Sequence, residues 1–112
     1  DISWTQSEIE VRGSNLHGTD IGVSEIPSLI DELPVLAVAS AFSTGQSVLR
    51  GAQELRVKEC DRIKAVVTNL KKFGVDIEEK EDGWIINSGR DIIGAEVSSF
   101  GDHRIAVSMV VA

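Results

Sequence analysis

Cysteine and aromatic residues are scarce in this sequence of 112 residues. Cys60 is the only cysteine, so no disulfide can form within the chain, and a metal site built on several thiolates is excluded. Such sparing use of cysteine is typical of a reducing compartment. Only 4% of the residues are aromatic. We therefore expect a core built mainly from Val, Ile, Leu and Ala.

Long apolar runs and a surplus of basic residues are missing as well. The longest strongly apolar run covers residues 33–42 and is too short to cross a bilayer, which takes about 20 residues. The formal net charge is −7, from 18 acidic and 11 basic residues. Because nucleic acids recruit basic surfaces, this balance argues against nucleic acid as the main partner. A small anionic ligand stays compatible with it, since a few clustered cations suffice to bind one.

Six short segments have the alternating or apolar pattern of β-strands. The segments are residues 7–12, 20–23, 46–51, 75–79, 83–87 and 95–99. Asp82 and Gly83 separate two of these segments and predict a hairpin turn between them.

Three apolar stretches predict helices between the strands. Pro34 suits the first turn of a helix, and residues 35–42 behind it are apolar on every side, as in a fully buried helix. A second helix has one apolar face and ends at Gly74. Asp102 is the expected N-cap of a third helix over residues 105–111. This order of segments favours an α/β or α+β fold, with helices buried against a sheet.

Each predicted helix follows directly on a charged stretch. These stretches lie around Asp31, at residues 58–62 and at residues 102–104. The first turn of a helix offers unpaired N–H groups and about half a positive charge, so it is a natural binding site for anions.

The stretch at residues 58–62 puts two cations where we expect the second helix to begin. On one helix, Lys58 and Arg62 would share a face beside an end that is already positive. A solvated helix end with a Glu59–Arg62 ion pair is the simpler interpretation, and an exposed pair contributes on the order of 0.5 kcal/mol. A bound anion is the other interpretation. The helix start would also favour the Cys60 thiolate, although no base is paired with it.

His103 and Arg104 stand at the start of the third helix, again beside an acid. Together, Arg62 and Arg104 could present two guanidinium groups to one carboxylate or phosphate. Asp31 either caps the helix of Pro34 or accepts a hydroxyl proton at the mouth of a site.

This combination of stretches resembles a known family. The motif "RVKECDRI" precedes a helix ending in "LKKFG", "GDHR" follows about 30 residues later, and "IPSLIDELPVLAVASAFSTG" lies upstream. Over nearly the whole chain, these motifs are similar to those of the 5-enolpyruvylshikimate-3-phosphate synthases. Cys60 departs from the family pattern, because Thr or Ser often stands at its position.

The resemblance implies a fold of two domains, each with three βαβαββ units whose helices point their N-termini at the cleft between the domains. Since the chain begins with Asp1 rather than Met, we expect residues 1–112 to form one to two units of the C-terminal-type domain. We expect them to hold about half of the site and to be inactive without the remainder of the parent chain. The parent protein is expected to be monomeric and cytoplasmic, without nucleic acid or membrane partners.

The resemblance also implies a reaction, in which the enolpyruvyl group of phosphoenolpyruvate passes to the 5-hydroxyl of shikimate 3-phosphate and phosphate leaves. No cofactor or metal is implied. By position, Asp31 and Lys58 resemble the residues that engage the hydroxyl, and Glu59 resembles the acid that transfers a proton at the methylene carbon. Arg62 and Arg104 resemble the pair that binds the carboxylate of phosphoenolpyruvate.

His103 lies beside that pair, so it is included among the substrate-binding candidates. Two alternatives remain open at this point. One is the sister enzyme UDP-N-acetylglucosamine enolpyruvyl transferase, which shares the fold and the donor. The other is a non-catalytic anion-binding α/β module, which would be favoured if the three helix starts pointed in different directions.

Overall fold

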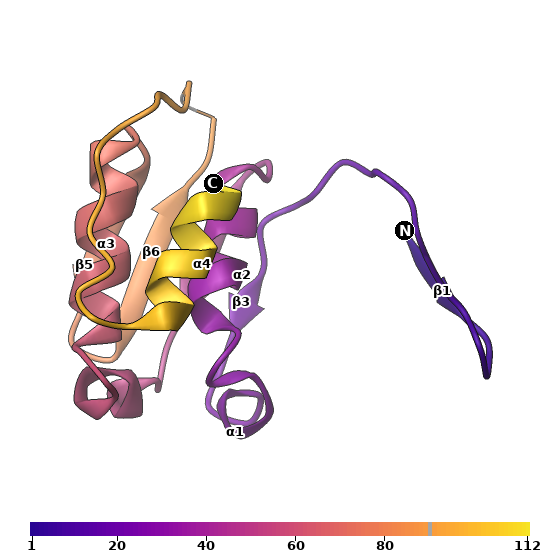
Figure 1. The fold of residues 1–112 in the computed structure, drawn as a ribbon, viewed down its shortest axis with the longest axis horizontal. Helices are drawn as coiled ribbons and strands as arrows, with labels where there is room; N and C mark the ends of the chain where they lie inside the picture. The colour runs from indigo at the N-terminus through magenta and orange to yellow at the C-terminus, as the bar shows by residue number, and fades with distance from the viewer. Residues whose placement is uncertain (90) are drawn as a thin grey trace.

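The chain folds into a four-stranded sheet with helices packed on one face, in a computed structural model that describes residues 1–89 and 91–112 (Figure 1). The strands are β1 (Ile2–Trp4), β2 (Ile9–Val11), β3 (Asp20–Ile21), β4 (Gln46–Leu49), β5 (Asp76–Lys80) and β6 (Gly83–Asn87). The helices are α1 (Ile26–Leu29), α2 (Leu33–Ala41), the 3-10 helix η1 (Gln53–Val57), α3 (Arg62–Lys72) and α4 (His103–Val111). Within the described ranges, these helices all fall short of the length and apolar character that a bilayer crossing requires.

The sheet has the order β3-β4-β6-β5. Strand β3 is parallel to β4, and β6 is antiparallel to both β4 and β5. Parallel neighbours need a crossover, which α2 provides. Apart from the short α1 and η1, the elements from β3 to β6 run strand, helix, strand, helix, strand, strand. This is the βαβαββ order that the resemblance predicted.

The hairpin of β5 and β6 turns one residue earlier than predicted. Glu81 and Asp82 form the turn, whereas Gly83 already pairs with Lys80 inside the ladder. A Cβ atom on Gly83 would lie 2.1 Å from the carbonyl oxygen of Leu49, so only glycine allows β4 and β6 to approach this closely.

The core lies between the sheet and the three longest helices. Its most buried side chains, at most 1% exposed, include Leu33, Val66, Leu70, Ile86 and Ile105. They come from α2, α3, β6 and α4. Burying a side chain of this size stabilises the fold by about 1.5–3 kcal/mol. The apolar core therefore fixes α2, α3 and α4 side by side, with their N-termini at the same end of the molecule (Figure 1).

Three predicted signals for helix ends are confirmed, although α2 and α4 begin two residues earlier than predicted and α3 begins only at Arg62. Pro34 lies in the first turn of α2. Gly74 follows α3 with a φ of +85°, and such left-handed backbone is where glycine ends a helix. Asp102 caps α4 with its side chain.

The predicted strand at residues 95–99 is wrong, because that segment has no strand neighbour. The fully buried Asn69 of α3 takes the place of a neighbouring strand. Its Nδ2 donates to the carbonyl of Ser98 at 2.8 Å, and its Oδ1 accepts from the Ser98 N–H at 3.1 Å. Only Val97 of this segment packs against the core, and the Asn69 contact guides the chain toward the start of α4.

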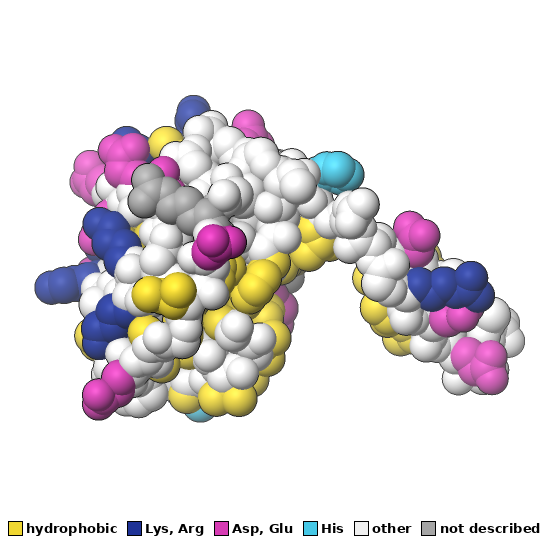
Figure 2. Space-filling view, turned by 90° about the horizontal axis from the view of Figure 1, so that it is seen from above, with side chains coloured by type: hydrophobic (Ala, Val, Ile, Leu, Met, Phe, Trp, Pro, Cys, Tyr) yellow, Lys and Arg dark blue, Asp and Glu magenta, His cyan; other side chains and the backbone are white. Residues whose placement is uncertain are grey.

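The hairpin of β1 and β2 stands apart from the rest of the molecule (Figures 1 and 2). Its register pairs Ile2 with Val11 and Trp4 with Ile9, so these four apolar side chains share one face. All four are at least 65% exposed. The hairpin contributes nothing to the core that positions the helices.

Candidate functional site

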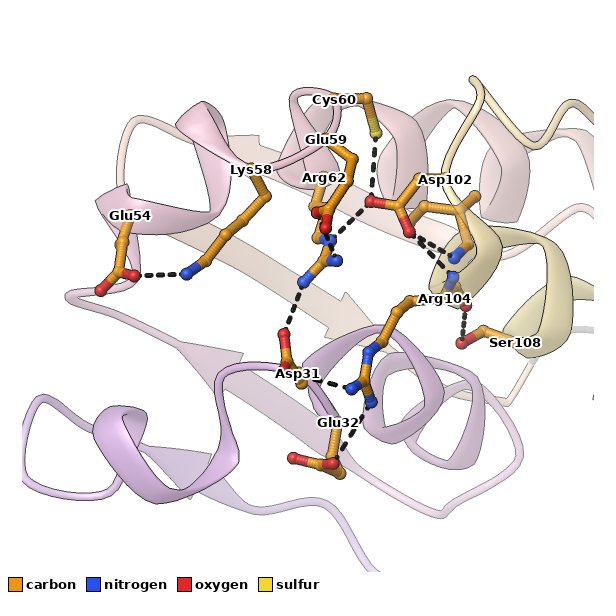
Figure 3. A network of polar contacts seen from close by, with 11 residues as sticks. Asp31, Glu32, Glu54, Lys58, Glu59, Cys60, Arg62, Asp102, Arg104 and Ser108 are labelled. Atoms are coloured by element: carbon orange, nitrogen blue, oxygen red, sulfur yellow. Dashed lines mark hydrogen bonds and ion pairs between the residues drawn. The ribbon is translucent and has the colours of Figure 1, made fainter.

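The first turns of α2, α3 and α4 meet around the side chain of Arg62 (Figure 3). Arg62 is the first residue of α3, and its side chain is only 1% exposed. Its Nη1 donates to Asp31 at 2.9 Å, its Nη2 to Glu59 at 2.7 Å, and its Nε to Asp102 at 2.7 Å. The solvated helix end is therefore the wrong interpretation for Arg62, although its predicted pair with Glu59 is confirmed.

The surroundings keep Arg62 charged. Burial alone would lower the pKa of its guanidinium group, but the hydrogen bonds to Asp102 and Asp31 outweigh burial and raise the pKa above its ordinary value. A buried arginine whose three nitrogens all face carboxylates is a rigid cation, unlike a surface arginine.

Asp31 joins two helix starts. The N-cap position of α2 is Glu32, which makes no side-chain cap, so the capping interpretation of Asp31 is wrong. One oxygen of Asp31 accepts from Arg62 at 2.9 Å, and the other accepts from Arg104 Nη2 at 3.2 Å. The pKa of Asp31 is lowered, first by the hydrogen bond from Arg62, against burial, and then by the nearby charges of Arg104 and Lys58. Asp31 thus holds the place that a ligand carboxylate would take between two arginines.

Asp102 lies on the opposite side of Arg62. It caps α4 through Oδ1, which accepts from the N–H groups of Arg104 at 2.8 Å and Ile105 at 3.4 Å. Its Oδ2 accepts from Arg62, and its side chain is 0% exposed. Burial alone would raise the pKa of Asp102, but the hydrogen bonds from Arg62 and from the two N–H groups lower it below its ordinary value.

Lys58 does not belong to α3, so the predicted shared helix face with Arg62 is wrong. It follows η1, and its ammonium group pairs with Glu54. The loop between η1 and α3 is anchored by Arg56, which donates to Glu79 at 2.8 Å and to Asp61 at 2.9 Å. This anchor holds Lys58 close enough to the site for its charge to act on Asp31.

A cleft of about 420 Å³ opens between the starts of α2 and α4. Its lining residues are Asp31, Glu32, Val35, His103, Arg104, Val107 and Ser108. His103 is exposed and lines this cleft beside Arg104, whose Nη1 also contacts Glu32 at 3.4 Å. The cleft gives a ligand access to Asp31 and Arg104 from solvent.

The surroundings of Cys60 do not favour a thiolate. Burial raises the pKa of its thiol, and the negative charge of Asp102, whose Oδ2 lies 3.9 Å from Sγ, acts in the same direction. Burial first, and then this carboxylate, outweigh the help that the helix start was expected to give.

The structure thus brings together Asp31, Glu59, Arg62 and Arg104, and it leaves Lys58 and His103 at the edges. Helix starts that point in different directions would have favoured the non-catalytic α/β module, but the three helix starts converge. Sequence reasoning missed that Asp102 binds Arg62, since the two stand 40 positions apart and no spacing rule connects them.

The carboxylates outnumber the cations at this site. Asp31, Glu32, Glu59 and Asp102 contact the two guanidinium groups of Arg62 and Arg104. Asp31, Glu32 and Glu59 are 43%, 54% and 53% exposed, in contrast to Asp102. An incoming anion would therefore take the place of exposed carboxylates rather than fill an empty site.

The βαβαββ topology, with helix starts gathered at one end, defines an enolpyruvyl transferase fold. The sequence profile of the family described as EPSP synthase (3-phosphoshikimate 1-carboxyvinyltransferase) matches residues 1–112. The chain belongs to this family, which confirms the family and the fold predicted from the sequence.

Individual relatives agree with the family match. A 3-phosphoshikimate 1-carboxyvinyltransferase of Akkermansia muciniphila is 53% identical over 100% of this chain and 26% of the relative. One of Aquifex aeolicus is 52% identical over 87% of this chain and 22% of the relative. The structure of the EPSP synthase of Acinetobacter baumannii superimposes with a TM-score of 0.84 at 44% identity, over 89% of this chain and 24% of that one. The chain thus spans about a quarter of the length of these relatives.

Proposed function

We propose that this chain forms part of the active site of an enzyme that transfers the enolpyruvyl group of phosphoenolpyruvate to the 5-hydroxyl of shikimate 3-phosphate, with release of phosphate. The observation that carries this proposal is the convergence of Arg62 and Arg104, from two helix starts, on the single carboxylate of Asp31. Two guanidinium groups around one carboxylate match the donor's own carboxylate in charge and shape.

In the proposed complex, the carboxylate of phosphoenolpyruvate replaces Asp31 between Arg62 and Arg104. The displaced Asp31 is then free to accept a hydrogen bond from the 5-hydroxyl. Its pKa is below the ordinary value while it is paired, so it is ionised before the ligand arrives. Donor binding therefore supplies an ionised carboxylate at the cleft, where an acceptor hydroxyl has to lose its proton.

The remaining candidates follow from their places around the arginines. Glu59, held by Arg62 at 2.7 Å, delivers a proton to the methylene carbon as the hydroxyl oxygen adds to the neighbouring carbon. When phosphate leaves, the methyl carbon gives up a proton, the carbon–carbon double bond is restored, and the product is an enol ether of the acceptor. Lys58 contacts the same hydroxyl and assists the movement of its proton, and His103 contributes to binding beside Arg104. The helix N-termini stabilise the charge that moves to the phosphate.

The domain assignment is part of this proposal. Residues 20–87 would form one βαβαββ unit, whereas the β1–β2 hairpin and α4 would belong to neighbouring units of the C-terminal-type domain. The chain would then hold about half of the site, and the isolated 112 residues would not turn over substrate. We expect the full-length protein to act as a monomer in the cytoplasm.

The test is the release of phosphate by the full-length protein that carries this chain. We expect release with phosphoenolpyruvate and shikimate 3-phosphate, and none with phosphoenolpyruvate and UDP-N-acetylglucosamine. The opposite preference, or no release with either acceptor, contradicts the proposal.

Two variants test the arginine pair. Arg62→Lys and Arg104→Lys keep the charge but lose the planar fork, so the KM for phosphoenolpyruvate should rise about 10- to 100-fold. Arg12→Lys is the matched control, because Arg12 pairs only with Glu10 in the described part of the chain, on the exposed hairpin. An equal change in all three variants would refute the assignment.

A further inference from the structure

Asp102 is bound to both halves of the arginine pair at once, and it is closed to solvent. One oxygen accepts from the side chain of Arg62, and the other accepts from the backbone N–H of Arg104. The side chains of Asp102 and Arg62 are 0% and 1% exposed. Among the described contacts of the site, this carboxylate is therefore the one that joins the two helix starts by hydrogen bonds and is closed to water and ligands.

We propose that Asp102 is a positioning residue, which fixes the orientation of the Arg62 guanidinium group and its place relative to the helix start that carries Arg104. The inference rests on the proposed function, since it concerns how the pair that binds the donor is kept in shape. It assigns Asp102 no contact with substrate and no proton transfer.

The geometry of Arg62 supports this role. The hydrogen bond of Nε restricts the orientation of the whole guanidinium group, because the group is planar. Because Asp102 takes Nε, the Nη1 and Nη2 groups point toward Asp31 and Glu59, which are the exposed and replaceable partners. Asp102 is thus the permanent partner, and the opposite edge of Arg62 stays available for exchange with a ligand.

The chain before α4 fixes Asp102 in turn. Phe100 and Gly101 have φ values of 52° and 75°, and this left-handed backbone turns the chain sharply into the helix. The Asp102 N–H donates to the carbonyl of Ser99 at 3.0 Å, next to the Ser98 contact with Asn69 of α3. Asp102 is therefore anchored to α3 through its own backbone as well as through Arg62.

A cap without a positioning role is the competing explanation, and Asp61 provides the matched comparison. Asp61 caps α3 by accepting from the Lys64 N–H at 3.0 Å, and it accepts from Arg56 at 2.9 Å. Like Asp102, it is an aspartate at an N-cap position that pairs with an arginine. In the described structure, however, its side chain forms no hydrogen bond or ion pair with the guanidinium group of Arg62 or Arg104. Replacing it tests what the loss of a capping carboxylate does by itself.

The experiment uses the full-length protein with Asp102→Asn, Asp102→Ser and Asp61→Asn. Asparagine and serine keep an oxygen for the cap, but neither supplies the negative partner of Arg62 Nε. We expect the KM for phosphoenolpyruvate to rise about 10- to 100-fold in both Asp102 variants, as is typical when a binding group shifts by about 1 Å. The KM for shikimate 3-phosphate should stay within about twofold. In Asp61→Asn the KM for phosphoenolpyruvate should also stay within about twofold, because Glu79 and two backbone carbonyls still hold Arg56.

Two kinetic outcomes overturn the inference. One is an unchanged KM for phosphoenolpyruvate in either folded Asp102 variant. The other is a rise of both KM values alike, because a general loosening of the site would weaken the binding of both substrates, whereas a smaller fraction of folded protein lowers only the apparent kcat.

A second measurement needs neither a variant nor turnover. In the wild-type protein labelled with ¹⁵N-arginine, the Nε–H of Arg62 should exchange with water at least about 100-fold more slowly than that of Arg56, which donates to the Glu81 carbonyl near the surface. Equal exchange rates overturn the positioning role. If the wild-type protein releases no phosphate while Arg62 stays protected, the proposed function fails and the role of Asp102 in holding the arginines stands.

Discussion

The first turns of α3 and α4 are built from the same parts at different depths. Asp61 caps α3 and pairs with Arg56, and Asp102 caps α4 and pairs with Arg62. The side chain of Asp61 is 34% exposed, whereas that of Asp102 is 0% exposed. The first pair holds a loop against the β5–β6 hairpin, and the second pair joins two helices.

The two pairs have the same residue types, so the difference in their roles follows from how deeply each pair is buried. Water competes for the partners of an exposed pair, so its loss is tolerated. A buried pair has no such substitute, and removing one partner leaves a charge without compensation. Only the buried pair can therefore hold a binding group in one orientation.

The largest difference between the two pairs is expected when the arginine of each pair is replaced. Arg62→Met leaves Asp102 buried without its counter-charge, and the free energy of unfolding should fall by about 3–5 kcal/mol. Arg56→Met should lower it by about 1 kcal/mol, because its partners turn to water. Urea denaturation of the two variants checks the difference, and equal losses would show that depth does not matter here.

Acid is expected to have the next largest effect. Since the pKa of Asp102 is lowered in the folded protein, its ionised form stabilises the fold at and above the ordinary carboxyl range, about pH 4. That contribution disappears as the pH falls through the folded-state pKa. The stability of the wild-type protein should thus fall more steeply below about pH 4 than that of Asp102→Asn. Thermal unfolding between pH 6 and pH 2 checks this, and parallel curves would contradict it.

The smallest effect is expected at the half-buried cap of α3. Asp61→Asn keeps a good capping side chain and loses only the half-buried pair with Arg56, which water still reaches, so the free energy of unfolding should change by less than about 0.5 kcal/mol. Asp61→Ala, which also removes the cap, should cost about 1 kcal/mol. Urea denaturation separates the two, and equal losses would show that the ion pair matters more than the cap.

The helices and most strands were predictable because their signals are local. Pro34 and Gly74 mark helix ends by backbone geometry alone, and alternating side chains mark the strands. The segment at residues 95–99 shows the limit. It alternates like a strand, but Asn69 satisfies the main chain of Ser98, and no local pattern identifies that contact.

The site residues were predictable through family motifs, but their contacts were not. The sequence placed Lys58 on the helix of Arg62, but Lys58 directly follows η1, and residues 59–61 lie between it and the start of α3. It treated Asp102 as a cap only, because the contact with Arg62 depends on how α3 and α4 pack. Contacts between distant segments arise from packing, which spacing along the chain does not encode.

The assembly of the site from three first turns has a consequence for recognising distant relatives. The chain enters the site in short windows at residues 31–32, 58–62 and 102–104, and between them it leaves the site to build strands and helix bodies. Insertions in the intervening strands and helices would change the number of residues between the windows without moving the windows in space. A sequence pattern that allows gaps of variable length between the three windows should therefore detect divergent members that a pattern of fixed length overlooks.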